Sequence, residues 1–287
     1  MSARLGILLL RALAPLPLSW LRALGAALGL ALFALARSRR RVALTNLRLC
    51  FPDWDEARRR ALARRNFIIF SQALLDRAWV WHAPPEVARR RVRITGAVDA
   101  LRQGAVIGFA PHFYGMDAGG CAVMQQVVAR GSSIYTRQSD PVADAWLRAG
   151  RLRFGDVVLL NREEGVKPII RSLREGRSLY LLPDMDFGPQ ESIFVPFFGV
   201  PAATVPSLAR LARLGRAPVV PVVTRMTPQG YEVQVDPPWT DYPGDDPYAD
   251  TLLMNQRLES YIRQMPEQYY WVHKRFKTRP PGEPAVY

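Results

Sequence analysis

The sequence predicts an α/β protein with a central, mostly parallel β-sheet flanked by helices, preceded by an apolar helix that associates with a membrane. Two observations predict this class. From about residue 92, short β-rich runs alternate with helical stretches, which is typical of a sheet layered by helices. Before that point, residues 1–40 are the most apolar part of the chain and run into a basic cluster. We therefore expect an N-terminal membrane-anchoring segment over 1–40 and a single domain over 41–287.

The segment 1–40 is too interrupted to predict a clean transmembrane helix. Its longest charge-free stretch, residues 23–36, has fourteen residues, whereas a spanning helix needs about 20. The basic run "RSRRR" that follows favours a helix that lies in the interface or inserts partially, with its arginines at anionic head groups on the cytoplasmic side. A signal peptide ending at "ALA" is one alternative, although Arg22 lies inside its apolar core. A buried helix hairpin is the other.

The remaining elements follow in chain order. Residues 53–80 have helical periodicity, with an aspartate at a plausible N-cap and acids in the first turn, and "HAPPE" ends the helix. The expected strands are "AVIGFA", "SSIYT", "VVLL", "SLYLL", "APVVPVV" and "YEVQV". The expected helices are "MDAGGCAVMQQVVAR", "DPVADAWLRAG", "GVKPIIRSLREG", "ATVPSLARLARLG" and a closing "YADTLLMNQRLESYIRQM".

The net charge of +14 indicates an anionic partner: nucleic acid, a lipid head group or an acidic protein. Only Lys167, Lys274 and Lys277 are lysines, so part of the arginine excess reflects GC-rich coding. A nucleic-acid-binding protein would interleave base-stacking aromatics with its cations, or carry a recognised module. Here the longest basic stretch follows an apolar helix. We expect a membrane surface as partner and no nucleic acid.

Cysteine and histidine usage predicts neither a disulfide framework nor a metal site. Cys50 and Cys121 form no C-x-x-C motif, and the three histidines have no ligand-like spacing.

The string "GFAPHFYGMD" carries the best candidate for chemistry. His112 follows a predicted strand, at the end where open α/β sheets gather ligands, and Asp117 falls in the first turn of the next helix. A carboxylate folded back onto one ring nitrogen would fix the histidine tautomer, which is the arrangement for a general base acting on a hydroxyl. The alternative makes His112 a structural loop residue and Asp117 a helix-terminus charge.

Longer strings resemble a known family. They are "NLRLCFPDW", "LLNREEGVKPIIRSLREG", "YLLPDMDFGPQESIFVPFFGVPAATVPSLARLAR" and "PEQYYWVHKRFKTRP". Together, and in order over essentially the whole chain, they resemble the bacterial lipid A late acyltransferases, the lauroyl and myristoyl transferases of the H-x4-D/E glycerolipid acyltransferase group. The resemblance implies a glycerolipid acyltransferase-like fold over 41–287. It also implies transfer of a fatty acyl chain from acyl carrier protein to a hydroxyl of a phosphorylated lipid A precursor, at the cytoplasmic face of the inner membrane.

The resemblance also implies roles for individual residues. His112 would be the general base and Asp117, where many members have Glu, its orienting partner. The implied substrate-binding residues are Arg137, Arg162, Asp184, Asp186, His273, Lys274 and Arg275. The arginines suit phosphate or the forming oxyanion, and the two aspartates would shape the site or hold the acceptor. The tail residues suit acceptor phosphates or the acidic carrier protein, with a solvated basic tail as the alternative.

The chemistry needs little else. A thioester is already activated, so the enzyme must only deprotonate an alcohol, align it and stabilise an oxyanion. We expect no metal and no cofactor, with the acyl carrier protein thioester as co-substrate. The sequence has no G-x-S-x-G motif for a serine nucleophile. Acylation of another glycolipid, such as a phosphatidylinositol mannoside, and hydrolysis of thioesters are alternative activities.

Overall fold

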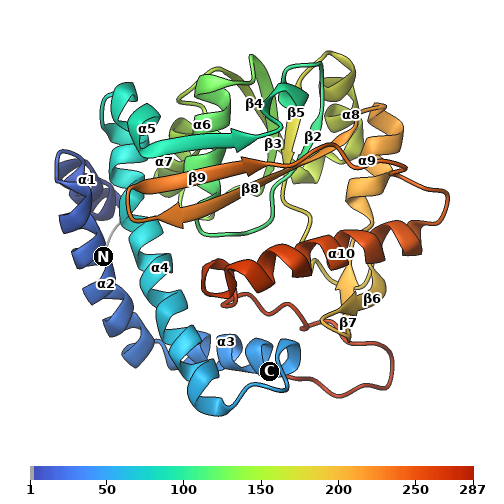
Figure 1. Cartoon of the computed structure of the whole chain (residues 1–287), viewed down its shortest axis with the longest axis horizontal. Coiled ribbons are helices and arrows are strands. Elements are labelled where there is room, and N and C mark those ends of the chain that lie inside the picture. The colour runs from blue at the N-terminus through green and yellow to red at the C-terminus, as the bar shows by residue number, and fades with distance from the viewer. Residues whose placement is uncertain (1–2) are drawn as a thin grey trace.

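A seven-stranded sheet forms the centre of the protein in a computed structural model that describes residues 3–287 (Figure 1). Its strand order is β1-β9-β8-β2-β5-β3-β4. All neighbours are parallel except β8 and β9. The bounds are β1 Val92–Gly96, β2 Ile107–Phe109, β3 Arg130–Tyr135, β4 Asp156–Asn161, β5 Ser178–Leu181, β8 Val219–Thr227 and β9 Gly230–Val235. The predicted mostly parallel sheet is confirmed.

Helices cover both faces of the sheet. One face carries α5 (Pro85–Arg91), α6 (Met116–Gln126) and α7 (Pro141–Arg151), and the other carries α8 (Val166–Arg174), α9 (Ser207–Gly215) and α10 (Pro247–Gln264). Alternation along β8 supplies both cores, because successive side chains in a strand point to opposite faces. Val219 and Val223 pack with the α8–α10 side, whereas Val220 and Val222 pack with the α6 side.

The N-terminal part consists of four helices: α1 (Ala3–Leu13), α2 (Leu18–Leu35), α3 (Arg37–Cys50) and α4 (Glu56–His82). The helix predicted over 53–80 is α4, and it begins with an aspartate N-cap, as the sequence indicates. Asp55 is its N-cap and accepts a hydrogen bond from the backbone N–H of Arg58 at 2.7 Å. Figure 1 shows α1 and α2 lying beside α4 at one edge of the molecule.

Two glycines let α2 approach α4 closely. A Cβ atom at Gly25 would lie 2.7 Å from Cα of Gln72, and one at Gly29 would lie 2.5 Å from Cα of Ile68. Arg22, which interrupts the apolar segment, faces the protein and pairs with the buried Asp76 at 2.9 Å. The residue that weakens the transmembrane prediction therefore joins α2 to α4.

The outward side of this helix pair is apolar. Of the helices in the described chain, α2 is long and apolar enough to cross a membrane by length and composition, with a mean hydropathy of 1.7. Its 18-residue window is 17% buried. Residues 1 and 2 of the predicted segment 1–40 lie outside the described residues.

Two features were not predicted from the sequence: β1, and a separate antiparallel hairpin of β6 (Ile193–Phe197) and β7 (Val200–Thr204). The hairpin turns at Phe198 and Gly199, which both have positive φ, as the tight turns of hairpins require. The helix predicted from "ATVPSLARLARLG" was placed too early. Its first residues belong to β7, and α9 begins only at Ser207, after a proline.

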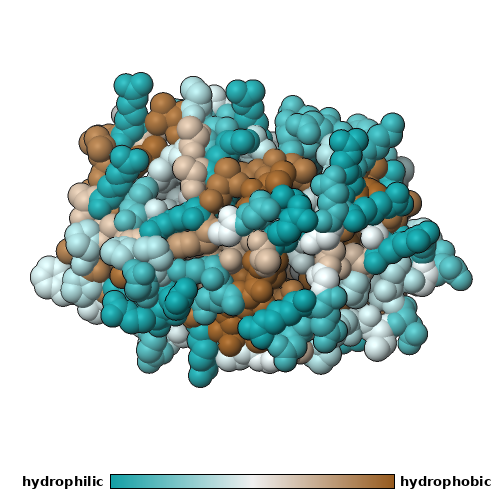
Figure 2. Space-filling view, turned by 90° about the horizontal axis from the view of Figure 1, so that it is seen from above, coloured by the Kyte–Doolittle hydropathy of each residue, from teal (hydrophilic) through white to brown (hydrophobic). Residues whose placement is uncertain are grey.

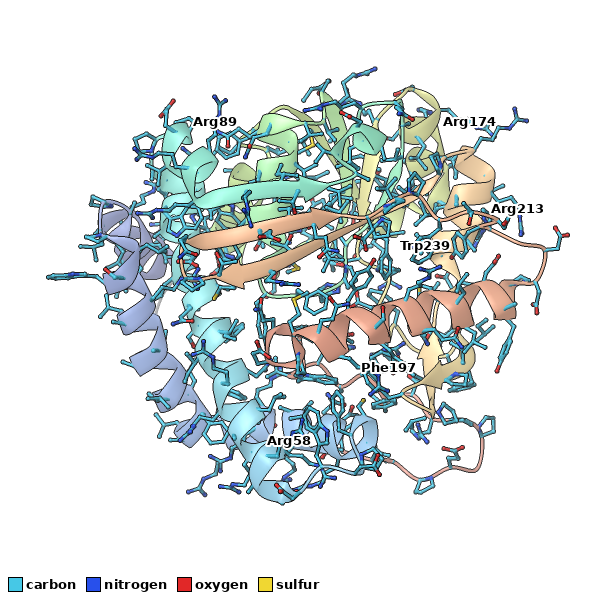
Figure 3. The ribbon with its side chains drawn as sticks, in the orientation of Figure 1. Arg58, Arg89, Arg174, Phe197, Arg213 and Trp239 are labelled. Carbon is cyan, nitrogen blue, oxygen red and sulfur yellow. The ribbon has the colours of Figure 1, made fainter. Side chains whose placement is uncertain are left out.

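Charged side chains cover much of the surface. Arg58, Arg89, Arg174 and Arg213 point outward from the periphery, whereas Phe197 and Trp239 lie inside (Figure 3). Seen from above in Figure 2, hydrophilic side chains project around the rim. Hydrophobic surface shows between them, both across the middle and on the side where Figure 1 places α1. The surface therefore offers hydrophilic and apolar regions side by side.

Candidate active site

Four of the predicted site residues follow the carboxyl ends of parallel strands, which all lie at the same end of the sheet. His112 follows β2, Asp184 follows β5, Arg137 follows β3 and Arg162 follows β4. Because β2 and β5 are neighbours in the sheet, the segments that contain His112 and Asp184 leave it side by side. The loops that carry Arg137 and Arg162 lie further along this end of the sheet, because β3 and β4 come after β5 in the strand order.

The His112 imidazole is held by the carboxylate of Asp184. Oδ1 of Asp184 lies 2.7 Å from Nδ1 of His112, and Oδ2 accepts the backbone N–H of His112 at 3.0 Å. The Asp184 side chain is fully buried, while 18% of the His112 side chain is exposed. Both oxygens of one carboxylate therefore fix the same residue, through its ring and its backbone.

The electrostatics of this pair define the histidine tautomer. Burial alone would raise the pKa of Asp184, but His112 and the hydrogen bonds from its ring, its backbone and the Tyr269 side chain lower that pKa below its usual range. An ionised carboxylate only accepts hydrogen bonds, so Nδ1 of His112 carries the hydrogen. In the neutral imidazole this tautomer has its lone pair on Nε2, where a general base requires it.

The prediction that Asp117 orients His112 is wrong. Asp117 lies in the first turn of α6, but Arg77 donates to its Oδ2 from Nη2 at 2.7 Å and from Nε at 3.0 Å, and Arg151 donates to its Oδ1 at 3.3 Å. Burial would raise the pKa of Asp117, and the two guanidinium groups outweigh it and lower that pKa. The first turn of α6 presents this carboxylate to α4 and α7, where two cations hold it.

The C-terminal tail completes the surroundings of His112. The backbone N–H of Tyr270 donates to the carbonyl of His112 at 3.1 Å, and Phe113 forms an antiparallel bridge with Tyr269. The Tyr270 ring is close to parallel with the rings of His112 and His273, with centroid distances of 6.1 Å and 6.4 Å. The tail therefore contacts the histidine loop through both the backbone and the ring of His112.

Asp186 and His273 tie this tail to the loop after β5. The backbone N–H of Asp186 donates to Nε2 of His273 at 3.1 Å, and the Asp186 carboxylate accepts from the backbone and hydroxyl of Thr278, both at 2.9 Å. Burial, Arg275 and His112 lower the pKa of His273 to about 4. His273 is therefore neutral near pH 7 and acts as an acceptor within the fold, where the sequence analysis expected a substrate contact.

This depressed pKa makes stability depend on pH. The ordinary pKa of histidine is about 6.5, so the unfolded chain takes up the proton first, and stability falls as the pH drops from about 6.5 towards 4. We expect this residue to contribute a slope of at most about 1.4 kcal/mol per pH unit. In the His273→Gln variant, whose amide oxygen replaces the acceptor, that contribution should vanish from denaturant titrations. Equal slopes for the variant and the parent would contradict the assignment.

The structure contradicts the prediction for Arg275, whereas that for Lys274 stays a prediction. Arg275 is 2% exposed, and its guanidinium donates to the carbonyl of Ala203 at 2.8 Å and to the Thr204 hydroxyl at 2.7 Å. It anchors the tail to the β6–β7 hairpin, so it cannot reach a phosphate at the surface. Lys274 is exposed, and its ammonium lies 5.5 Å from the centroid of the Tyr287 ring.

Arg162 and Arg137 are both exposed at the sheet edge. The guanidinium of Arg162 lies 3.4 Å from the centroid of Phe187, whose side chain is 42% exposed. This contact brings the "NREEG" and "PDMDFGP" segments together. Arg137 lies in the loop between β3 and α7. Both positions suit contact with a large anionic molecule.

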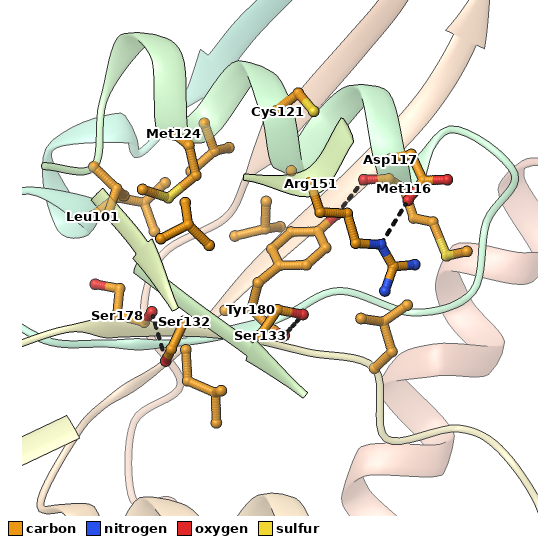
Figure 4. A pocket seen from close by; sticks show the side chains of 18 of the residues that line it. Leu101, Met116, Asp117, Cys121, Met124, Ser132, Ser133, Arg151, Ser178 and Tyr180 are labelled. Carbon is orange, nitrogen blue, oxygen red and sulfur yellow. Dashed lines mark hydrogen bonds and ion pairs between the residues drawn. The ribbon is translucent and has the colours of Figure 1, made fainter. Parts of the chain in front are cut away.

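Two neighbouring hollows share Met116 in the first turn of α6, and His112 lines one of them. We call the first the histidine hollow, and its lining is Phe70, Ala73, Leu74, Arg77, His112, Phe113, Tyr114, Met116 and Tyr270. The second, the α6 cavity, lies between α6 and the sheet and is mostly apolar (Figure 4). Met116 lines both, and the Arg77–Asp117 ion pair bridges them, because Arg77 lines the first and Asp117 the second. The apolar α6 cavity therefore adjoins the histidine hollow at Met116.

Arg77, Arg151, Tyr269 and Tyr270 were not predicted as site residues from the sequence. The two tyrosines lie in the string "PEQYYWVHKRFKTRP", in which only His273, Lys274 and Arg275 were given roles. Arg77 and Arg151 lie in ordinary helical stretches, among many arginines. No local signal distinguishes them from surface cations.

Comparison with known proteins identifies the family. The family model described as "Bacterial lipid A biosynthesis acyltransferase" matches residues 1–278. The chain is 34% identical to the lipid A biosynthesis lauroyltransferase of Escherichia coli, over 99% of this chain and 94% of that protein. It is 35% identical to the myristoyltransferase of the same organism, over 88% and 80%. A lipid A biosynthesis acyltransferase of Haemophilus influenzae is 32% identical, over 97% and 88%.

A solved structure, the 1-acyl-sn-glycerophosphate acyltransferase from Thermotoga maritima, aligns with a TM-score of 0.40 at 14% identity, over 81% of this chain and 95% of that chain. The match to the family model over nearly the whole sequence shows that this chain belongs to the bacterial lipid A biosynthesis acyltransferase family and is an acyltransferase.

Proposed function

We propose that the protein transfers a fatty acyl group from an acyl carrier protein thioester to a hydroxyl of a phosphorylated lipid A precursor, with His112 as general base. The observation that carries this proposal is the His112 imidazole, held at Nδ1 by Asp184 next to a hollow that adjoins an apolar cavity. The names of the relatives, which are lipid A biosynthesis acyltransferases, support the acceptor.

The proposed reaction has two steps. Nε2 of His112 takes the proton of the acceptor hydroxyl while the oxygen attacks the thioester carbonyl carbon, and the carbonyl oxygen becomes an oxyanion. When the tetrahedral intermediate collapses, the C–S bond breaks and the carrier thiolate takes the proton from the imidazolium. Asp184 stays ionised and stabilises the imidazolium between the steps. The acyl carrier protein thioester is the co-substrate, and the reaction needs no resident metal or cofactor.

The two hollows give each substrate a place. An acyl chain in the α6 cavity would bring its thioester to the end lined by Met116, Asp117 and Arg151. Arg77 and Arg151 are the cations at that junction. We propose that their guanidinium groups stabilise the oxyanion there, because charge that develops in a site screened from water is stabilised most by fixed donors.

The acceptor and the carrier protein are both anionic. Arg162 and Arg137, exposed at the sheet edge, are the proposed phosphate contacts, since guanidinium groups bind phosphate through paired hydrogen bonds. The basic rim would attract an acidic carrier protein and speed its encounter.

We propose that residues 1–40 hold the protein at the cytoplasmic face of the inner membrane. Eight large apolar side chains are exposed on this helix pair: Leu5, Leu8, Leu9, Trp20, Leu24, Leu28, Leu30 and Leu35. The cluster Arg37–Arg41 follows directly, and such clusters favour the cytoplasmic side of a membrane. Sedimentation with phosphatidylglycerol vesicles tests this placement, and a chain that stays in the supernatant would contradict it.

The test of the function is mass spectrometry of the lipid product after incubation with acyl carrier protein thioesters and a tetra-acylated lipid A precursor. His112→Gln should lower the transfer rate by about 10²- to 10⁴-fold, because general-base catalysis contributes this much. His82→Gln is the matched control, since His82 pairs with Trp146 at 3.0 Å between α4 and α7. Near-parental turnover of His112→Gln would refute the assignment of the base. Acyl release without transfer would indicate a hydrolase.

A further inference from the structure

We propose that Met124 sets the length of the acyl chain that the α6 cavity accepts, and that Gly131 seats its thioether at the closed end. The inference rests on the proposed function, because it assumes that this cavity holds the donor acyl chain. It concerns selection among donors, which the identity of the general base does not determine.

The wall of the α6 cavity suits a hydrocarbon chain. Its polar side chains near the sheet already have partners: the Ser133 hydroxyl donates to the carbonyl of Tyr180 at 3.2 Å, and the Tyr180 hydroxyl donates to the carbonyl of Met116 at 3.2 Å. The Ser132 hydroxyl donates to the carbonyl of Ser178 at 3.4 Å. The rest of the wall is largely aliphatic. A chain without hydrogen-bonding groups can therefore enter without stranding a buried donor.

The cavity has a chemical end and a far end. Figure 4 shows Met116, Asp117 and Arg151 at one end, and Leu101 and Met124 at the other. Helix α6 runs along the cavity between these ends. The rise along the helix from residue 117 to residue 124 is about 10 Å. A chain whose thioester lies at the chemical end would therefore extend towards Met124.

Two glycines make room for the Met124 side chain. A Cβ atom at Gly131 would overlap Sδ of Met124 and lie 2.9 Å from its Cε, and one at Gly155 would lie 3.0 Å from that Cε. Gly131 is the second residue of β3 and pairs in register with Val157 and Ser178. The thioether of Met124 therefore occupies the space that a side chain at residue 131 would take.

This seat predicts opposite effects for two small changes. Removing the Met124 side chain opens the far end to more carbons. Adding a methyl group at Gly131 pushes the thioether away from residue 131 and into the cavity, because methionine is flexible enough to move. Gly131 lacks the positive φ of Gly155, so alanine fits its backbone without strain, and its contact with Met124 is the main obstacle.

The experiment measures kcat/KM of the full-length protein for saturated acyl carrier protein thioesters of even length, from octanoyl to hexadecanoyl, with one lipid A precursor. Each buried methylene changes transfer to an apolar site roughly fourfold. We define a ratio as kcat/KM for a donor two carbons longer than the parent's preferred donor, divided by kcat/KM for that preferred donor. Met124→Ala should raise this ratio by at least about tenfold. Gly131→Ala should shift the preference towards shorter donors. Met124→Phe, which fills the same end, should do likewise.

The double variant Met124→Ala with Gly131→Ala gives the sharpest readout. Without the Met124 thioether, the methyl group added at residue 131 has no side chain to displace. The effect of Gly131→Ala on the preferred chain length of the donor should therefore largely disappear. Met226→Ala, a partly buried methionine on β8 outside the cavity lining, is the matched control and should keep the parental profile. Parental profiles for the Met124 and Gly131 variants, with transfer intact, would overturn the inference. Absence of transfer by the parent from every thioester would instead refute the proposed function.

Discussion

Asp184→Asn is expected to lower acyl transfer by about 10³- to 10⁴-fold, the scale seen when a triad carboxylate becomes an amide. The reason is that the two oxygens of the Asp184 carboxylate contact different groups of His112. One oxygen of Asp184 accepts the backbone N–H of His112, so the amide oxygen of asparagine must take that place. Its NH₂ group then faces Nδ1, which must become the acceptor. The hydrogen moves to Nε2, and the base is lost although the side chains stay in position.

Double-mutant analysis tests this reading of the pair. Because Asp184 acts through His112, Asp184→Asn combined with His112→Gln should be little slower than the worse of the two single variants. Asp186→Asn is the matched control: it makes the same change two residues away, in a carboxylate that holds Thr278. We expect it to cost far less activity. Fully additive losses for Asp184 and His112 would show that the carboxylate acts elsewhere.

The sequence predicted His112 but not its partner, and the reason is physical. The spacing in "GFAPHFYGMD" reports only a loop followed by a helix start, so it brings Asp117 close in the chain without fixing which way the first turn points. Asp184 reaches the imidazole because β2 and β5 are adjacent, although 72 residues separate the pair. Alternation of strands and helices predicts a sheet but leaves the order of its strands open. The order therefore decides which carboxylate meets the histidine.

The roles of the basic residues in the C-terminal tail could not be predicted from the sequence either. A run such as "HKRFK" predicts solvated cations, and Lys274 is exposed. Arg275 is buried because the β6–β7 hairpin, which was not anticipated, offers it a carbonyl and a hydroxyl. These two acceptors bind its terminal nitrogens, and its guanidinium lies 5.2 Å from the centroid of the Phe197 ring, so part of the cost of burying the charge is offset. Whether a basic residue binds a ligand or the fold thus depends on tertiary partners that a single sequence does not display.

Asp117→Asn is expected to destabilise the fold by roughly 3 kcal/mol, near the lower end of the range for breaking a buried ion pair. The amide would leave Arg77 and Arg151 facing each other without their anion. Both guanidinium side chains are about one-quarter exposed, at 24% and 25%, so water offsets part of the cost. Asp117→Glu, which keeps the charge, is the matched control and should stay near the parental stability.

The pH dependence of this loss identifies its cause. The folded-state pKa of Asp117 is depressed, so its charge stabilises the protein above the ordinary aspartate value of about 3.9, and the contribution is lost as the pH falls through the lower folded value. The difference between the parent and Asp117→Asn in urea titrations should therefore be full at pH 7 and shrink in acid. If Asp117→Asn were as stable as the parent, and its loss of activity were non-additive with that of His112→Gln, then Asp117 would act on the imidazole after all.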